Sequence, residues 1–175
     1  FLLVGDFDIQ IDFNITAGAG SGSGQRIAAF GVFVPYNDSW FFWAMRDESN
    51  GGRYRIQGVS PSGSVDQSES TTETAGKLRI VRKAGEVKGY RWSNGWEQIT
   101  SYSLTGLGEP VFVVIDTHSF SSGVACTCEW QNFKINKGTV IWLNSKPKGA
   151  YTKIKLADNS VQEFIEGLDA KALCM

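Results

Sequence analysis

Residues 6–15 of the chain read DFDIQIDFNI. Phenylalanine and isoleucine occupy every second position of this stretch, and aspartate, glutamine and asparagine occupy the positions between them. Successive side chains of a β-strand point to opposite faces, so this alternation predicts a long strand with one buried face and one face in solvent. The stretch AGAGSGSG at 17–24 follows directly, and its glycines and small residues predict a loop.

Further short segments with the character of strands follow at regular spacing, and none of them has the periodicity of a helix. They cover residues 25–34, 39–46, 53–59, 77–83, 86–92, 96–101, 110–117 and 123–136. DESNGG at 47–52 and Ala84-Gly85 each indicate a hairpin turn, and the polar segment 60–75 reads as a loop with a short edge strand. This pattern predicts an all-β fold, a two-sheet antiparallel β-sandwich (jelly roll) with a small C-terminal appendage.

The segment from residue 123 changes which positions are apolar partway along its length. One side carries Val124, Cys126, Cys128 and Trp130, whereas Phe133 and Ile135 require the opposite register. A β-bulge near Gln131 and Asn132 would bring both groups to the same face, because a bulge adds one residue to one strand of a pair.

The length of 175 residues suits one substantial core and argues against two independent domains. We expect a sandwich over residues 1–136 and a C-terminal extension over 137–175, with strands at 139–143 and 151–156. Two structures fit the next segment, 157–170. Ser160 and Glu163 form a capping box that favours a short helix, and 157–159 (Ala-Asp-Asn) could instead turn a hairpin. The pattern slightly favours the helix.

The charge pattern argues against nucleic acid as a partner. The 17 basic and 18 acidic residues are interspersed and give a net charge of −1, so no broad basic surface is expected. No apolar stretch reaches the roughly 20 residues that span a bilayer. The start at Phe1 suggests a processed product or a segment of something longer, and an extracellular, cell-surface or virion location is expected. The cysteines, Cys126, Cys128 and Cys174, are expected to be free or buried thiols.

Three stretches carry a family resemblance: 76–99 (GKLRIVRKAGEVKGYRWSNGWEQI), FDIQIDFN near the start and CEWQNFKIN near the end. Together they resemble the concanavalin A-like lectin/glucanase (laminin G-like) superfamily over about residues 5–136. The resemblance implies two curved antiparallel sheets, with sugars bound on the concave face or at loops along one edge, and it makes Trp96 a structural residue. Many members of this superfamily hold a calcium ion, so a structural calcium is an expectation here.

Pairing the strands of two hairpins predicts a binding face. If the 47–52 turn is symmetric about Ser49 and Asn50, one side is core-like and carries Trp43, Met45, Tyr54 and Ile56. The other side then carries Trp40, Phe42, Arg46, Arg53, Arg55 and Gln57. The same reasoning for the Ala84-Gly85 hairpin places Leu78, Ile80, Val87 and Gly89 opposite Lys77, Arg79, Lys88, Tyr90 and Trp92.

If both hairpins belong to one sheet, their mixed sides form a single face of arginines and aromatic rings. The predicted ligand-binding residues are Tyr36, Trp40, Arg46, Arg53, Arg55, Gln57, Arg79, Tyr90 and Trp92, where Tyr36 comes from a loop at the sheet edge. Rings would stack on sugars, and arginines would favour acidic glycans through bidentate pairing with carboxylates. The alternative is an ordinary solvated sheet face on which arginine stems cover the rings.

No residue cluster has the spacing of a known catalytic site. Asp6, Asp8 and Asp12 share one side of the first strand, but they lack the glutamates of the hydrolases in this superfamily; they could instead supply an oxygen ligand to calcium. His118 is the sole histidine, and it is expected in a loop, THSFSSG. No catalytic residue is therefore predicted, and polysaccharide lyase or glycoside hydrolase activity remains an alternative.

The sequence favours a non-catalytic carbohydrate-binding or adhesion module of a larger or processed extracellular or surface protein. The expected partner is a glycan or polysaccharide, acidic if the arginines select it. The second hypothesis is a structural assembly protein, such as a virion, tail or filament component. In that case residues 137–175 would dock on neighbouring copies and form a homo-oligomer or a larger assembly.

Overall fold

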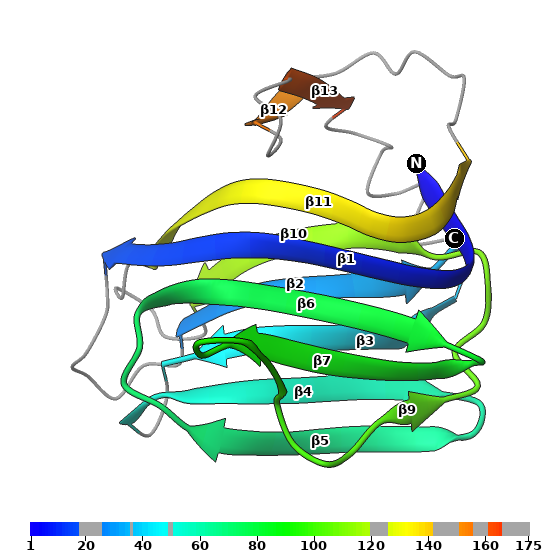
Figure 1. Ribbon diagram of the computed structural model, residues 1–175, viewed down its shortest axis with the longest axis horizontal. Coiled ribbons are helices and arrows are strands. Elements are labelled where there is room, and N and C mark those ends of the chain that lie inside the picture. The colour runs from blue at the N-terminus through cyan, green and yellow to red at the C-terminus, as the bar shows by residue number, and fades with distance from the viewer. Residues whose placement is uncertain are drawn as a thin grey trace.

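The computed structural model describes residues 1–17, 26–35, 37–48, 51–119, 126–141, 151–155 and 161–165. Two antiparallel sheets pack face to face as a sandwich (Figure 1). The six-stranded sheet has the order β11-β1-β6-β7-β8, and β9 also pairs with β7. Its strands are β1 (Leu2–Ala17), β6 (Ala75–Lys83), β7 (Glu86–Trp92), β8 (Trp96–Gln98), β9 (Leu104–Thr105) and β11 (Thr127–Ile141).

The five-stranded sheet has the order β10-β2-β3-β4-β5. Its strands are β2 (Arg26–Val34), β3 (Asn37–Asp47), β4 (Arg53–Ser60), β5 (Gly63–Ser70) and β10 (Phe112–Ser119). The predicted all-β sandwich is confirmed. The segment 60–75, expected to be mostly loop, instead contains the eight-residue strand β5, which forms the edge of this sheet next to β4.

The core lies between the two sheets and confirms the alternation of the first strand. The alternating apolar positions between residues 7 and 15 of β1 are all buried: Phe7, Ile9, Ile11, Phe13 and Ile15. They meet side chains from the inner face of the other sheet, including Phe30, Phe42 and Ile56, in one continuous cluster. Removal of this apolar surface from water is the main force that holds the two sheets together.

The hairpin between β6 and β7 has the predicted register. Lys83 pairs with Glu86, and the two turn residues, Ala84 and Gly85, have φ angles of 51° and 79°. Two consecutive positive φ angles are typical of a type I′ turn, whose twist matches that of paired strands. The two sides predicted for this hairpin are therefore confirmed, with Leu78, Ile80, Val87 and Gly89 facing the core.

The hairpin between β3 and β4 differs from the prediction by one residue. Asp47 pairs with Arg53 and Trp43 pairs with Gln57, so the register is centred on residue 50. A shift of one residue moves a side chain to the other face of a sheet. Trp43 and Met45 therefore lie on the outer face, whereas Phe42, Arg46, Tyr54 and Ile56 point inward.

The predicted bulge in β11 is confirmed. Asp12 pairs with Gln131 and Gln10 pairs with Lys134, so β11 has one more residue than β1 between these pairs. Asn132 takes the extra position with a φ angle of 54°. Phe133 can then point into the core on the same side as the half-buried Trp130.

The C-terminal part of the chain corrects one expectation. β12 (Tyr151–Lys155) pairs antiparallel with β13 (Val161–Ile165), so strand pairing replaces the favoured helix, and the hairpin alternative holds. The preceding strand, β11, continues to Ile141 and pairs there with Leu2, so it crosses the predicted boundary at residue 136. The part of the chain that the structure describes contains no candidate membrane-spanning helix.

Candidate functional site

The two hairpins that were expected to share a binding face belong to different sheets. The β3–β4 hairpin is part of the five-stranded sheet, and the β6–β7 hairpin is part of the six-stranded sheet. The inner faces of both sheets form the core, so the outer faces of the two hairpins point away from each other (Figure 1). The prediction of one continuous face of arginines and aromatic rings is therefore wrong.

The predicted site residues divide into four groups. Arg79, Tyr90 and Trp92 lie on the outer face of the six-stranded sheet, and Arg53, Arg55 and Gln57 lie on the outer face of the five-stranded sheet. Two others point inward: Arg46 is 1% exposed, and Trp40 is half-buried against the core. Tyr36 lies outside the described residues. The predicted residues thus share no single surface, and the two sets of three lie on opposite faces of the sandwich.

On the six-stranded sheet the predicted arginine is already occupied. Arg79 donates to both carboxylate oxygens of Asp8, at 2.7 and 2.5 Å, and its guanidinium lies over the rings of Tyr90 and Trp96. Burial alone would raise the pKa of Asp8, but hydrogen bonds from Arg79 and Asn136 and the charge of Arg79 hold it below its usual value. These contacts join β1, β6 and β7, so this face reads as a structural network.

The outer face of the five-stranded sheet carries a pocket, here called the face pocket. Its volume is about 330 Å³, and it is lined by Ile27, Ala29, Trp43, Met45, Arg55, Gln57 and His118. Ile27, Ala29 and Met45 form a small buried apolar cluster that provides the floor. An apolar floor with a few polar groups around it is the usual composition of a small-molecule site.

Trp43 owes its position in the face pocket to a glycine on the neighbouring strand. Gly31 pairs with Trp43 across β2 and β3, and a Cβ atom at Gly31 would lie 2.2 Å from Cε3 of the indole. The indole can therefore lie directly over the β2 backbone, where any larger residue would displace it. Sequence reasoning placed Trp43 in the core; the glycine within the apolar run IAAFGVFV was the available signal for this close approach.

The arginines of this face are paired with carboxylates. Arg55 donates to both oxygens of Asp66 at 2.7 and 2.5 Å, which raises the pKa of Arg55 and lowers that of Asp66. Arg53 donates two hydrogen bonds, at 3.0 and 2.9 Å, to Oδ2 of Asp47, whose side chain is fully buried. The face therefore offers a ring, an amide and hydrogen-bonding groups without an excess of positive charge.

His118 belongs to strand β10, which corrects its expected loop position. It pairs with Ile27 in the strand register, so it reaches the same outer face as the floor of the face pocket. Its Nδ1 lies 2.6 Å from Oδ2 of Asp116, two residues earlier on the same side of the strand. The sequence THS carried no apolar alternation that would have placed this histidine on a strand.

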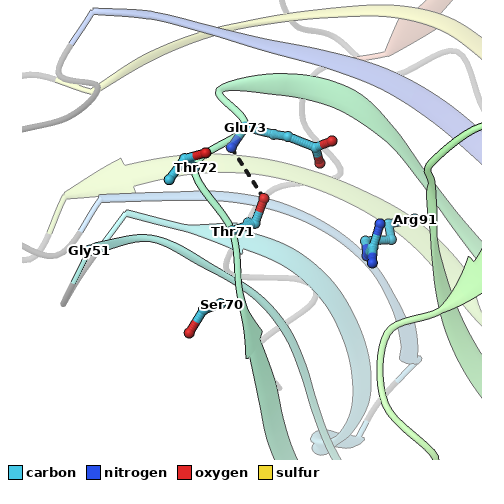
Figure 2. Close-up of a pocket in the computed structure, with 6 residues that line it drawn as sticks. All are labelled: Gly51, Ser70, Thr71, Thr72, Glu73 and Arg91. Atoms are coloured by element: carbon cyan, nitrogen blue, oxygen red, sulfur yellow. Dashed lines mark hydrogen bonds between the residues drawn. The ribbon is translucent and has the colours of Figure 1, made fainter.

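A second and larger pocket, here called the rim pocket, lies between the end of β5, the segment 71–73 and Arg91 of β7 (Figure 2). Its volume is about 430 Å³, and it is lined by Gly51, Ser70, Thr71, Thr72, Glu73 and Arg91. None of these lining residues has an aromatic or a large apolar side chain. Arg91 forms ion pairs with Glu69 and Glu97, and Tyr54 donates to Glu73 at 2.8 Å. These contacts tie the two sheets together, so we favour the face pocket as the site.

The described part of the chain holds no group of side chains that could bind the calcium expected from the resemblance. No three His, Cys, Asp or Glu side chains gather there in a way that could hold a metal ion. Asp6 accepts a hydrogen bond from the backbone of Ala84, and Asp12 pairs with Lys77. Cys128 is half-buried, and burial raises the pKa of its thiol to about 11, so it is a poor nucleophile. Bound calcium stays a prediction.

Comparison with known proteins supports a relationship at the level of structure but not of sequence. No protein-family model matches the sequence, and no curated protein matches it either. Among solved structures, the chain is similar to a mutant (K247S) of the GH43 protein BlXynB from Bacillus licheniformis, with a TM-score of 0.54 and 13% identity. The similarity covers 74% of this chain but only 27% of that protein. At this identity it supports the fold alone.

Proposed function

We propose that this chain is a non-catalytic carbohydrate-binding module that holds its ligand in the face pocket. The observation that carries the proposal is the indole of Trp43 lying over Gly31, beside Gln57, Arg55 and His118. A flat ring binds the apolar CH face of a sugar, while amide, guanidinium and imidazole groups bind its hydroxyls. The concanavalin A-like family resemblance supports the same class of ligand.

The ligand that this face favours is a neutral glycan. The sequence suggested acidic glycans because several arginines were expected on one face. Arg55 and Arg53 are instead engaged with Asp66 and Asp47, and a uronate carboxylate would have to displace these partners. A neutral sugar needs only the remaining hydrogen-bonding capacity at the pocket wall. We propose that the module belongs to a larger or processed extracellular or surface protein that presents it to such a polymer.

The test is retardation of the full chain in gels that contain neutral or acidic polysaccharides. We expect retardation by at least one neutral polymer. Trp43→Ala should weaken it by about tenfold or more, because truncating an aromatic residue at the centre of a binding site typically costs about 2 kcal/mol or more. The matched control is Trp92→Ala, which removes an indole that is 41% exposed on the opposite face. Equal retardation of wild type and Trp43→Ala would reject the face pocket, and retardation by acidic polymers alone would reject a neutral ligand.

A second candidate function is acid–base catalysis on the bound glycan. The specific observation is the pairing of His118 with Asp116 at the wall of the pocket that also contains Arg55 and Gln57. A carboxylate that orients an imidazole is the usual arrangement for proton transfer. The test is to incubate a polysaccharide with the wild type and with His118→Gln and to assay for new reducing or unsaturated chain ends. If such ends form with the wild type and not with the variant, the chain is an enzyme and not a binding module.

A further inference from the structure

Three phenylalanines form a row beside the face pocket. Phe112, Phe33 and Phe41 are cross-strand partners on β10, β2 and β3, and all three are half-buried on the outer face of the five-stranded sheet. Phe33 stands between the other two at centroid distances of 5.5 Å to Phe41 and 5.7 Å to Phe112, with interplanar angles of 23°. We call this group the phenylalanine row.

The geometry of the phenylalanine row does not suit a sugar ring. Phe33 is stacked between Phe41 and Phe112, so neither of its faces is open to a sugar. Sugar CH groups bind ring faces, whereas a ring edge carries the positive part of the aromatic quadrupole and favours the face of another aromatic ring. The binding of a glycan in the face pocket therefore leaves the row without a role.

The row and the pocket form one continuous surface. Phe33 contacts Trp43 edge to face, with centroids 5.0 Å apart and an interplanar angle of 78°. Phe41 and Trp43 are two positions apart on β3, which places their side chains about 7 Å apart along the strand. A group attached to a sugar in the face pocket through a single oxygen would reach the row. Val59 on β4 pairs with Phe41, and Ser64 on β5 pairs with Val59. These two residues extend the same line across the sheet and carry no charge.

We propose that the phenylalanine row binds an aromatic substituent of the glycan, such as an aryl ether, aryl ester or aryl aglycone. This inference rests on the proposed function, because the sugar that carries the substituent occupies the face pocket. The row adds specificity: glycans with an aryl group are selected over the same glycans without one. Contact between aromatic rings and the removal of apolar surface from water both favour this choice.

The experiment compares matched ligands by NMR titration of the full chain. The probes are the methyl and phenyl β-glycosides of glucose, xylose and galactose, together with benzyl alcohol, which has no sugar. For at least one sugar we expect the phenyl glycoside to bind about tenfold more tightly than the methyl glycoside. Phe112→Thr, which places a residue of high strand propensity on the edge strand β10, should remove most of that difference and leave methyl glycoside binding unchanged.

The variants separate this inference from the proposed function. Trp43→Ala should weaken the binding of both glycosides. If the methyl glycoside still binds to this variant, that result rejects the face pocket as the sugar site and not the phenylalanine row. Benzyl alcohol should shift the resonances of Phe33 and Phe41 in the wild type, and should shift them much less in Phe112→Thr. Equal affinity for methyl and phenyl glycosides, a phenyl preference that survives Phe112→Thr, or failure of both the phenyl glycosides and benzyl alcohol to bind would overturn the phenylalanine row as a binding surface.

Discussion

At the scale of single residues, Gly31 and Trp43 decide whether the face pocket exists. The indole occupies the space above Gly31 that a side chain on β2 would fill, and this brings the ring beside the apolar floor. The composition of the segment IAAFGVFV indicated a strand, but it did not show that Gly31 makes room for a side chain of the neighbouring strand. Such a close approach depends on which strand pairs with β2, which the local sequence does not contain.

The first prediction concerns Gly31→Ala. The added Cβ would lie 2.2 Å from the indole of Trp43, far below a normal contact, so the ring must move off the strand. We expect glycan affinity to fall by about tenfold, as for Trp43→Ala, and stability to fall by about 1–3 kcal/mol from the strain of overpacking. Affinity electrophoresis and urea unfolding measure the two effects. The matched control is Gly95→Ala, since a Cβ there would meet open space. Unchanged glycan binding by Gly31→Ala would contradict the role assigned to Trp43.

At the scale of elements, the sequence predicted the β3–β4 hairpin but not its register. The strand SWFFWAMR is apolar on both faces, so it has no alternation that identifies its core side. The predicted register was centred between Ser49 and Asn50, and the observed one is centred on residue 50. In β6 and β7, by contrast, a two-residue turn left no choice of register, and both faces were predicted correctly.

The change of register explains why Arg46 is buried inside the sandwich. It is a structural residue and not a ligand contact. Its Nε donates to the backbone oxygen of Glu73 at 2.5 Å, its Nη1 donates to the backbone oxygen of Asp47, and its Nη2 pairs with Glu48 at 2.7 Å. Burial lowers the pKa of Arg46, and the carboxylate of Glu48 opposes that effect. The side chain thus connects β3 to the loop that follows β5.

The second prediction is that Arg46→Met destabilises the fold by about 3–5 kcal/mol, because it removes a buried cation together with its ion pair to Glu48 and its hydrogen bonds to the backbone oxygens of Glu73 and Asp47. The free energy of unfolding in urea measures the loss. Lys88→Met serves as the control, since Lys88 pairs with Glu86 at the surface and its removal should change stability very little. A loss for Arg46→Met no larger than for Lys88→Met would show that Arg46 does not hold these elements together.

The third prediction concerns pH and the contact between β1 and β6. The pKa of Asp8 is lower in the folded chain than its usual value, so the ionised carboxylate stabilises the fold above about pH 4. That contribution is lost as the pH falls through the lowered pKa. Asp8→Asn should therefore reduce stability by about 1 kcal/mol at pH 7 and much less near pH 2. Urea unfolding at several pH values provides the measurement; a difference from the wild type that is constant with pH would contradict this account.

At the scale of the whole molecule, the sandwich was predicted from hairpins and alternation, but the arrangement of the hairpins was not. Sequence pattern identifies the faces of one hairpin, whereas its assignment to a sheet depends on contacts between distant segments. β6 lies beside β1, and β4 lies beside β5, and these pairings place the two predicted faces on opposite sides of the molecule (Figure 1). For this reason the predicted site residues lie on two different faces. The candidate site in the structure includes Trp43 and His118, which were not predicted, and excludes Arg46, Tyr90 and Trp92, which were.

The two outer faces now differ in a way that can be tested. On the six-stranded sheet the rings of Tyr90 and Trp96 are covered by Arg79, which is itself fixed by Asp8. On the five-stranded sheet Trp43 stands at a pocket with an apolar floor. The central claim is that the ligand is bound by the second face and not by the first.

The most direct test is NMR mapping of the full chain titrated with a neutral oligosaccharide cut from the polymer that retards it. The account predicts saturable shifts of the backbone amides of Gly31, Trp43 and Gln57 and of the indole N–H of Trp43, with no change around Tyr90, Trp92 and Trp96. Shifts confined to the six-stranded sheet around Tyr90 and Trp92, with those of the face pocket unmoved, would contradict it.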